Sequence, residues 1–118
     1  MNQKACATYS STHPSVVRLM KFIVDEASKY NVPVSVCGEI ASDPCLIPLL
    51  IGLGLKQLSV SSRFLPIIRH VVRSTSQKEA QELVKQVLAL KTSHDIYSLL
   101  TRDYEKNIPY GSLASIKE

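Results

Sequence analysis

The fold is decided by residues 32–44, which read VPVSVCGEIASDP. The alternating β-branched residues at its start predict a short strand over residues 32–37. Residues 38–42 predict a loop. Asp43 and Pro44 then predict the start of a helix, because aspartate is a good N-cap and proline fits the first helical turn. The stretch therefore indicates a strand, a loop and a helix in immediate succession.

A second unit of the same kind follows directly. The predicted helix after Pro44 is apolar around most of its circumference, so it must be covered on several sides. We expect Gly52 and Gly54 to end it, because glycine adopts the left-handed C-cap conformation at little cost. Residues 57–61, QLSVS, predict a second strand. Strands joined by so short a helical connection are expected to be parallel, with a right-handed crossover.

Helices are predicted on both sides of these units. One begins at Pro14 and ends near Tyr30, and its apolar positions at helical spacing are Val16, Met20, Ile23 and Ala27, with Val17 and Val24 beside them. Three more helices are predicted downstream, and the first is a short basic helix over residues 64–74. The second begins at the capping box Ser76-Gln77-Lys78-Glu79 and turns inward Ala80, Leu83, Val84, Val87 and Leu88. The last follows Ser93, and its inward residues are Ile96, Leu99, Leu100 and Tyr104. We expect residues 1–12 to be a loose leader, residues 13–109 to be the folded portion and residues 110–118 to be a flexible tail.

The two predicted strands share a pattern of side chains. Each has one apolar face, formed by Val34 and Val36 in the first and by Leu58 and Val60 in the second. The other face is small and slightly polar, with Ser35, Cys37, Ser59 and Ser61. Two parallel strands cannot bury both faces alone, and such sheets are normally closed barrels or larger open sheets. The sequence therefore predicts an α/β domain that is part of something larger.

Composition excludes several classes of protein. The chain has 118 residues, of which 45% are apolar and 20% charged, which fits one small globular domain. No apolar run approaches the roughly 18–20 residues that span a bilayer, and the N-terminus lacks the apolar core of a signal peptide. Three cysteines without a Cys-x-x-Cys pair argue against a disulfide framework or a zinc ribbon. A soluble, cytoplasmic protein is expected, with no membrane partner.

The net charge of +4 includes a local basic cluster of Arg63, Arg69, His70 and Arg73. Most charges in this half alternate in sign along the predicted helices, which is typical of solvated helix faces. We therefore expect no nucleic-acid partner.

Cys37 is the first candidate for chemistry, because it ends a predicted parallel strand. The carboxyl ends of such strands carry the active sites of α/β proteins. A thiol there can act as a nucleophile, a metal ligand or a proton donor, although no histidine is near in sequence to serve as its base. The alternative is a small buried hydrophobe, the commonest fate of a free cysteine. Glu39 and Arg63 could add charge near the same end, or could be ordinary solvated side chains.

The segments VSVCGEIASD (residues 34–43), PLLIGLGL (residues 48–55) and LSVS (residues 58–61) closely resemble the end of the phosphoenolpyruvate–protein phosphotransferases. These proteins are enzyme I of the bacterial sugar phosphotransferase system and belong to the phosphoenolpyruvate (PEP)-utilising enzymes. The resemblance runs from about Tyr9 to about Pro109, and residues 1–8 do not match. A fragment of a pyruvate phosphate dikinase or PEP synthase barrel is an alternative, since those enzymes share the Cys-Gly-Glu segment.

The resemblance implies that the chain forms the last two βα units of a TIM (β/α)₈ barrel, followed by two C-terminal helices. Cys37 matches the family's catalytic cysteine, the proton donor to enolpyruvate, and the backbone around Gly38 matches the part that lies against the substrate. The resemblance also implies PEP and pyruvate as ligands. For an intact enzyme it implies two protein partners, the phosphocarrier protein HPr and a second copy in a homodimer.

The resemblance also implies parts that this chain lacks. These are the phosphohistidine domain, the earlier strands with their phosphate-binding arginines, and the acidic ligands of Mg²⁺, so no metal ligand is assigned here. A complete barrel needs eight strands and about 250 residues. We expect a fragment that is inactive alone, and a non-catalytic dimerisation or interaction fragment is the alternative.

Overall fold

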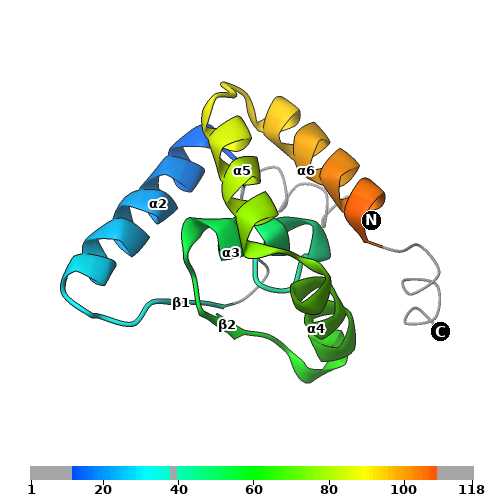
Figure 1. The fold of residues 1–118 in the computed structure, drawn as a ribbon, viewed down its shortest axis with the longest axis horizontal. Coiled ribbons are helices and arrows are strands. Elements are labelled where there is room, and N and C mark those ends of the chain that lie inside the picture. Colours follow the sequence, from blue (N-terminus) through cyan, green and yellow to red (C-terminus); the bar gives the residue numbers. More distant parts are fainter. Residues whose placement is uncertain (1–11, 38–39, 109–118) are drawn as a thin grey trace.

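The computed structural model describes residues 12–37 and 40–108. Helices dominate, and the one small sheet that is described lies beside α3, at the lower edge of the view in Figure 1. In chain order the elements are α2 (Pro14–Lys29), β1 (Ser35–Cys37), the 3₁₀ turn η1 (Pro44–Leu46), α3 (Ile47–Leu53), β2 (Gln57–Ser59), the 3₁₀ turn η2 (Ser62–Phe64), α4 (Leu65–Ser74), α5 (Gln77–Leu88) and α6 (Ser93–Asn107). The predicted alternation of helix and strand, followed by two helices, is confirmed.

The sheet is parallel, as predicted, with β1 paired to β2 in the register Ser35–Gln57, Val36–Leu58 and Cys37–Ser59. Each strand has three residues and is shorter than predicted. Pro33 has no backbone N–H to donate, so the ladder cannot extend far toward the start of β1. In the described part of the chain β1 and β2 pair only with each other, so no further strand extends the hydrogen-bonded ladder.

The core lies around α3, at the centre of Figure 1. Nearly every side chain of this helix is buried, including Ile47, Leu49 and Leu50, none of which has any exposed surface. The helix packs most closely against α5 and also contacts α2 and α4. The prediction that this helix must be covered on several sides is therefore confirmed, and hydrophobic burial around it holds the helices together.

The two glycines near the end of α3 have different roles. Gly54 is the C-cap in the left-handed conformation, with φ of 104°, as predicted. Gly52 lies inside α3, so the prediction that it helps to end the helix is wrong. A Cβ at Gly52 would overlap the carbonyl oxygen of Ala80 and would lie 2.7 Å from Cγ2 of Val84. Gly52 therefore lets α3 approach the backbone of α5 closely.

Helix α2 buries a narrower surface than its sequence pattern predicts. Val17 and Val24 are buried, whereas Ile23 is 45% exposed and Met20 is only half-buried. Val16 and Ala27 are likewise half-buried, so part of the stripe that the sequence places inward is only partly covered. Among the described elements, the helices that α2 contacts appreciably are α3 and α5.

The helix starts at Asp43 and Ser76 have the predicted side-chain caps, and α2 has a further cap at His13. The side chain of His13 accepts from the N–H of Ser15, and that of Asp43 accepts from the N–H of Cys45. Ser76 accepts from the N–H of Glu79 at 3.1 Å, the Ser half of the predicted capping box. Thr12, assigned above to a loose leader, is fully buried and its hydroxyl donates to the carbonyl of Ser93 at 3.4 Å, so the folded portion begins earlier than predicted. Residues 1–11 and 109–118, with the rest of that leader and the tail, lie outside the described residues.

Candidate active site

The candidate site lies where the two parallel strands end. Cys37 is the last residue of β1, and its partner in register is Ser59, the last residue of β2. Both side chains are exposed, on the face of the sheet that also carries Ser35 and Gln57. The other face carries Val36 and Leu58, which are half-buried and pack against the core. The division into an apolar and a small polar face is therefore confirmed.

The exposure of Cys37 excludes one of the alternatives that the sequence left open. It is an exposed thiol outside any disulfide, and not a buried hydrophobe. Cys45, in contrast, is half-buried and packs against the core, as expected for a structural residue. Gly38 and Glu39 lie outside the described residues, as does Cys6.

Positive charge follows β2 at the same end of the sheet. Arg63 lies in the turn η2, four residues after β2 ends, and its side chain is exposed. Its guanidinium carbon is 5.1 Å from the centre of the Phe64 ring, a cation–π contact that holds the charge at the surface. Arg69 and Arg73 are likewise exposed, on α4.

The acidic side chains that the structure describes do not gather into a metal centre. Among residues 12–37 and 40–108 there is no group of three or more histidine, cysteine, aspartate and glutamate side chains that could hold an ion. Glu79 and Asp103 line one groove between α5 and α6. Partial burial, and then the charge of Glu79, raise the pKa of Asp103, while the amide of Asn107 donates to its carboxylate at 3.0 Å. The donor set does not fit a magnesium site.

Comparison with known proteins now identifies the family. The sequence profile of the PEP-utilising enzyme, PEP-binding domain, matches residues 1–77. The chain belongs to the PEP-utilising enzyme family. The match begins at the first residue, so the expectation that residues 1–8 fall outside the resemblance is wrong.

Curated relatives of this PEP-utilising chain are phosphoenolpyruvate-protein phosphotransferases. The protein from Chlamydia trachomatis is 41% identical over 88 residues, which cover 75% of this chain and 15% of the relative. Those of Buchnera aphidicola and Mycoplasma genitalium are 37% and 34% identical and cover 80% and 90% of this chain, but only 16% and 18% of their own lengths. The chain therefore resembles the C-terminal part of these relatives and spans less than a fifth of their length.

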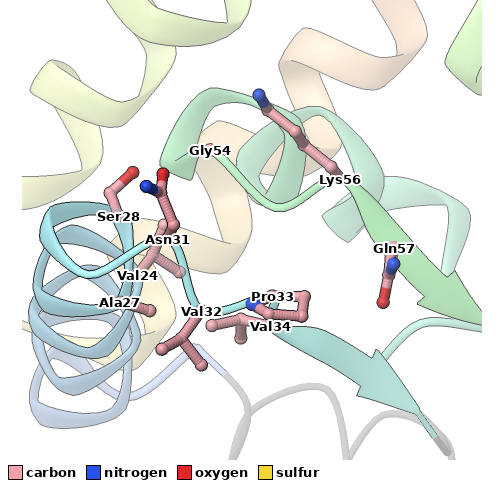
Figure 2. Close-up of a pocket in the computed structure, with 10 residues that line it drawn as sticks. All are labelled: Val24, Ala27, Ser28, Asn31, Val32, Pro33, Val34, Gly54, Lys56 and Gln57. Carbon is pink, nitrogen blue, oxygen red and sulfur yellow. The ribbon is translucent and has the colours of Figure 1, made fainter.

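A further hollow lies at the other end of the strands, away from Cys37. This pocket of about 430 Å³ lies between the end of α2 and the segments that lead into β1 and β2 (Figure 2). Its lining includes Ser28 and Asn31 from α2 and the turn after it, and Lys56 before β2. Sequence reasoning missed it because three segments form it together. The left-handed Asn31, with φ of 55°, marks the turn that shapes one wall, and asparagine is among the few residues that adopt it readily.

Within the same described ranges, no helix combines the length and the apolar character needed to cross a membrane.

Proposed function

We propose that this chain is the C-terminal part of the PEP-binding TIM barrel of a phosphoenolpyruvate–protein phosphotransferase, and that it supplies the thiol that protonates enolpyruvate. The family match and the names of the curated relatives support the substrate class. The observation that carries the role of Cys37 is its position: an exposed thiol at the carboxyl end of a parallel strand, beside Ser59.

The asymmetry of the sheet supports the barrel. Helix α3 connects β1 to β2 and packs on the apolar side of the strands, while the small polar side faces away from the helices. In a TIM barrel the helices surround the strands and the inward side chains fill the interior. The exposed Ser35, Cys37 and Ser59 face would then point into the barrel, at the end where active sites of this fold are found.

The proposed reaction needs one proton from this chain. When the phosphoryl group of PEP moves to a histidine, the bond between phosphorus and the enol oxygen breaks and the enolate of pyruvate remains. The S–H of Cys37 gives its proton to the terminal methylene carbon, which becomes the methyl group of pyruvate, and solvent restores the thiol. A general acid must carry its proton when the substrate arrives. The small side chain of Ser59 leaves room for a compact three-carbon ligand, and we assign the backbone of Gly38 to contact with it.

The rest of the machinery would come from outside this chain. A bound Mg²⁺ would neutralise charge on the phosphate, but the described residues do not offer its ligands, so no step is routed through it. The phosphocarrier HPr and a homodimer partner are proposed for the assembled enzyme. The chain alone is expected to form no pyruvate and to bind PEP weakly at most, which calorimetry would test. Micromolar binding by the lone chain would contradict this expectation.

The test of Cys37 uses a chimera in which this chain replaces the matching segment of the Chlamydia trachomatis relative. Pyruvate formation from PEP is followed with a coupled dehydrogenase. Removing a positioned general acid lowers the rate on the order of 10²–10⁴-fold, so we expect such a loss for Cys37→Ser. Cys45→Ala is the matched control, because it removes the other described thiol, which lies outside the proposed site. Unchanged turnover of Cys37→Ser would remove Cys37 from the mechanism.

A further inference from the structure

The pocket at the amino-terminal end of the strands is large enough for a small organic ligand. Its volume of about 430 Å³ falls within the range of ordinary ligand sites, roughly 300–1,000 Å³. Three segments border it, namely the end of α2 with the turn that follows, the entry to β1, and the connection from α3 to β2 (Figure 2). It lies at the opposite end of the strands from Cys37, so it is separate from the proposed catalytic site.

Two reversals of the backbone keep this pocket open. Asn31 and Gly54 have positive φ, 55° and 104°, and in the part of the chain that the structure describes no other residue does. Both line the pocket. Gly54 has no side chain to occupy the space, and a Cβ there would lie 3.2 Å from Cγ1 of Val24. The chain therefore turns at the end of α2 on one side and at the end of α3 on the other, with the hollow between the two turns.

Aliphatic side chains form the apolar part of the lining. Val24 is buried, and Ala27 and Val34 are half-buried. Val32 and Pro33, on the entry to β1, add exposed apolar surface. None of the ten lining residues in Figure 2 is aromatic. The lining therefore suits a short aliphatic chain rather than a ring that needs an aromatic stacking partner.

The polar part of the lining carries a single charge, that of Lys56. In the view of Figure 2 the ammonium group of Lys56, the amide of Asn31 and the hydroxyl of Ser28 lie above the valine side chains. The ten lining residues include no carboxylate. Ammonium, amide and hydroxyl groups all donate hydrogen bonds, so this edge of the pocket suits an anionic group that accepts them.

No neighbouring carboxylate neutralises Lys56. It forms no ion pair within the described ranges 12–37 and 40–108. The two acidic residues of α2 are Asp25 and Glu26, and their carboxylates pair with Lys21 and Lys29 at 3.0 and 2.9 Å. The ammonium group of Lys56 is therefore available to an anionic ligand.

We infer that this pocket binds a small monocarboxylic acid with a branched aliphatic chain. The carboxylate lies against the ammonium group of Lys56 and accepts from the Asn31 amide and the Ser28 hydroxyl, while the aliphatic chain packs on Val24 and Val34. An amino acid fits less well, because no lining carboxylate would pair with its ammonium group. For a ligand of about eight non-hydrogen atoms in a partly exposed site, we expect a Kd on the order of 1 mM.

The test uses isocaproate as the probe, in the 118-residue chain and in the chimera described above. Ligand-observed NMR measures the Kd in both proteins, and amide spectra of the lone chain locate the bound probe. We expect millimolar binding in both, with the largest shifts at the amides of Asn31, Gly54 and Gln57. Isocaproamide lacks the charge and acetate lacks the aliphatic chain, so each should bind at least about tenfold more weakly.

Two variants test the polar edge. Lys56→Gln removes the charge and keeps most of the aliphatic stem, and we expect it to weaken isocaproate binding at least about tenfold. Lys29→Gln is the matched control, because it removes an equal charge at the end of α2 from a residue outside the lining, and binding should not change. Asn31→Gly keeps a turn that glycine adopts readily and removes the amide, so it should weaken binding by a smaller factor.

Each other outcome overturns the inference. Equal binding of isocaproate and isocaproamide, or equal losses in Lys56→Gln and Lys29→Gln, would mean that Lys56 does not recognise a carboxylate. Shifts confined to α4 would assign the anion to the exposed Arg69 and Arg73. Binding by the lone chain alone would mean that the rest of the protein fills the pocket. A lack of saturable binding in both proteins would mean that the pocket does not hold this class of ligand.

Discussion

Replacing Gly52 by alanine is expected to separate α3 from α5. The new Cβ would overlap the carbonyl oxygen of Ala80, and it would lie 2.6 Å from the carbonyl carbon of Ala80 and 2.7 Å from Cγ2 of Val84. Overpacking a core contact costs about 1–3 kcal/mol. We expect the upper end of this range, because two of the three overlapped atoms belong to backbone that cannot rotate away.

A smaller effect acts in the opposite direction. Alanine stabilises a helix interior by about 1 kcal/mol relative to glycine. The net expectation for Gly52→Ala is a loss of about 2 kcal/mol in the free energy of unfolding, which corresponds to a fall of roughly 10 °C in Tm for a domain of this size. Both are measured by circular dichroism, in urea and on heating.

Second-site variants show whether the backbone is the cause. Val84→Ala removes only the side-chain overlap, so it should restore little stability in the Gly52→Ala background. Ala80→Gly should restore none, since the Ala80 atoms in the overlap are backbone. A Gly52→Ala chain as stable as the parent, or more stable, would refute the close approach of α3 and α5.

Two further predictions concern α5 and α6. Ser76→Ala removes the hydroxyl that accepts from the N–H of Glu79, so urea unfolding should show a loss of about 1 kcal/mol, and an unchanged midpoint would contradict the cap. The hydroxyl of Tyr104 is buried without a hydrogen-bond partner among the described residues, and burial, with lesser contributions from Cys45 and Asp43, raises its pKa from 10.0 to about 12. Tyr104→Phe should therefore increase the free energy of unfolding by about 1 kcal/mol at neutral pH, and marked destabilisation would argue against an unpaired hydroxyl. Because the unfolded chain ionises first, the parent should lose stability as the pH rises from 10 toward 12, and Tyr104→Phe should remove that part of the loss.

Local chemistry made the elements predictable. The Asp43-Pro44 and Ser76 signals depend on groups within a few residues of one another, so they act the same way in any fold. The alternation around Cys37 also predicted correctly which side of β1 meets the core, because side chains on a strand alternate by geometry alone. The resemblance to the PEP-utilising enzymes depended on the same short segments and was confirmed by the family match.

Contacts between distant segments were not predictable from the same patterns. Gly52 looked like a helix end in the sequence, and only the position of Ala80, 28 residues later, shows why a side chain cannot fit there. The pocket beside Lys56 arises where three segments meet, so no single stretch of sequence signals it.

The sequence by itself predicted the order of the helices and strands, that the two strands are parallel, and which family the chain belongs to, because these depend on local periodicity and on short motifs. Only the tertiary structure decided that Cys37 is exposed and that Ile23, on an equally apolar stripe, is left uncovered. The physical reason is that periodicity specifies a direction around a helix or strand, whereas burial depends on whether another segment occupies that direction.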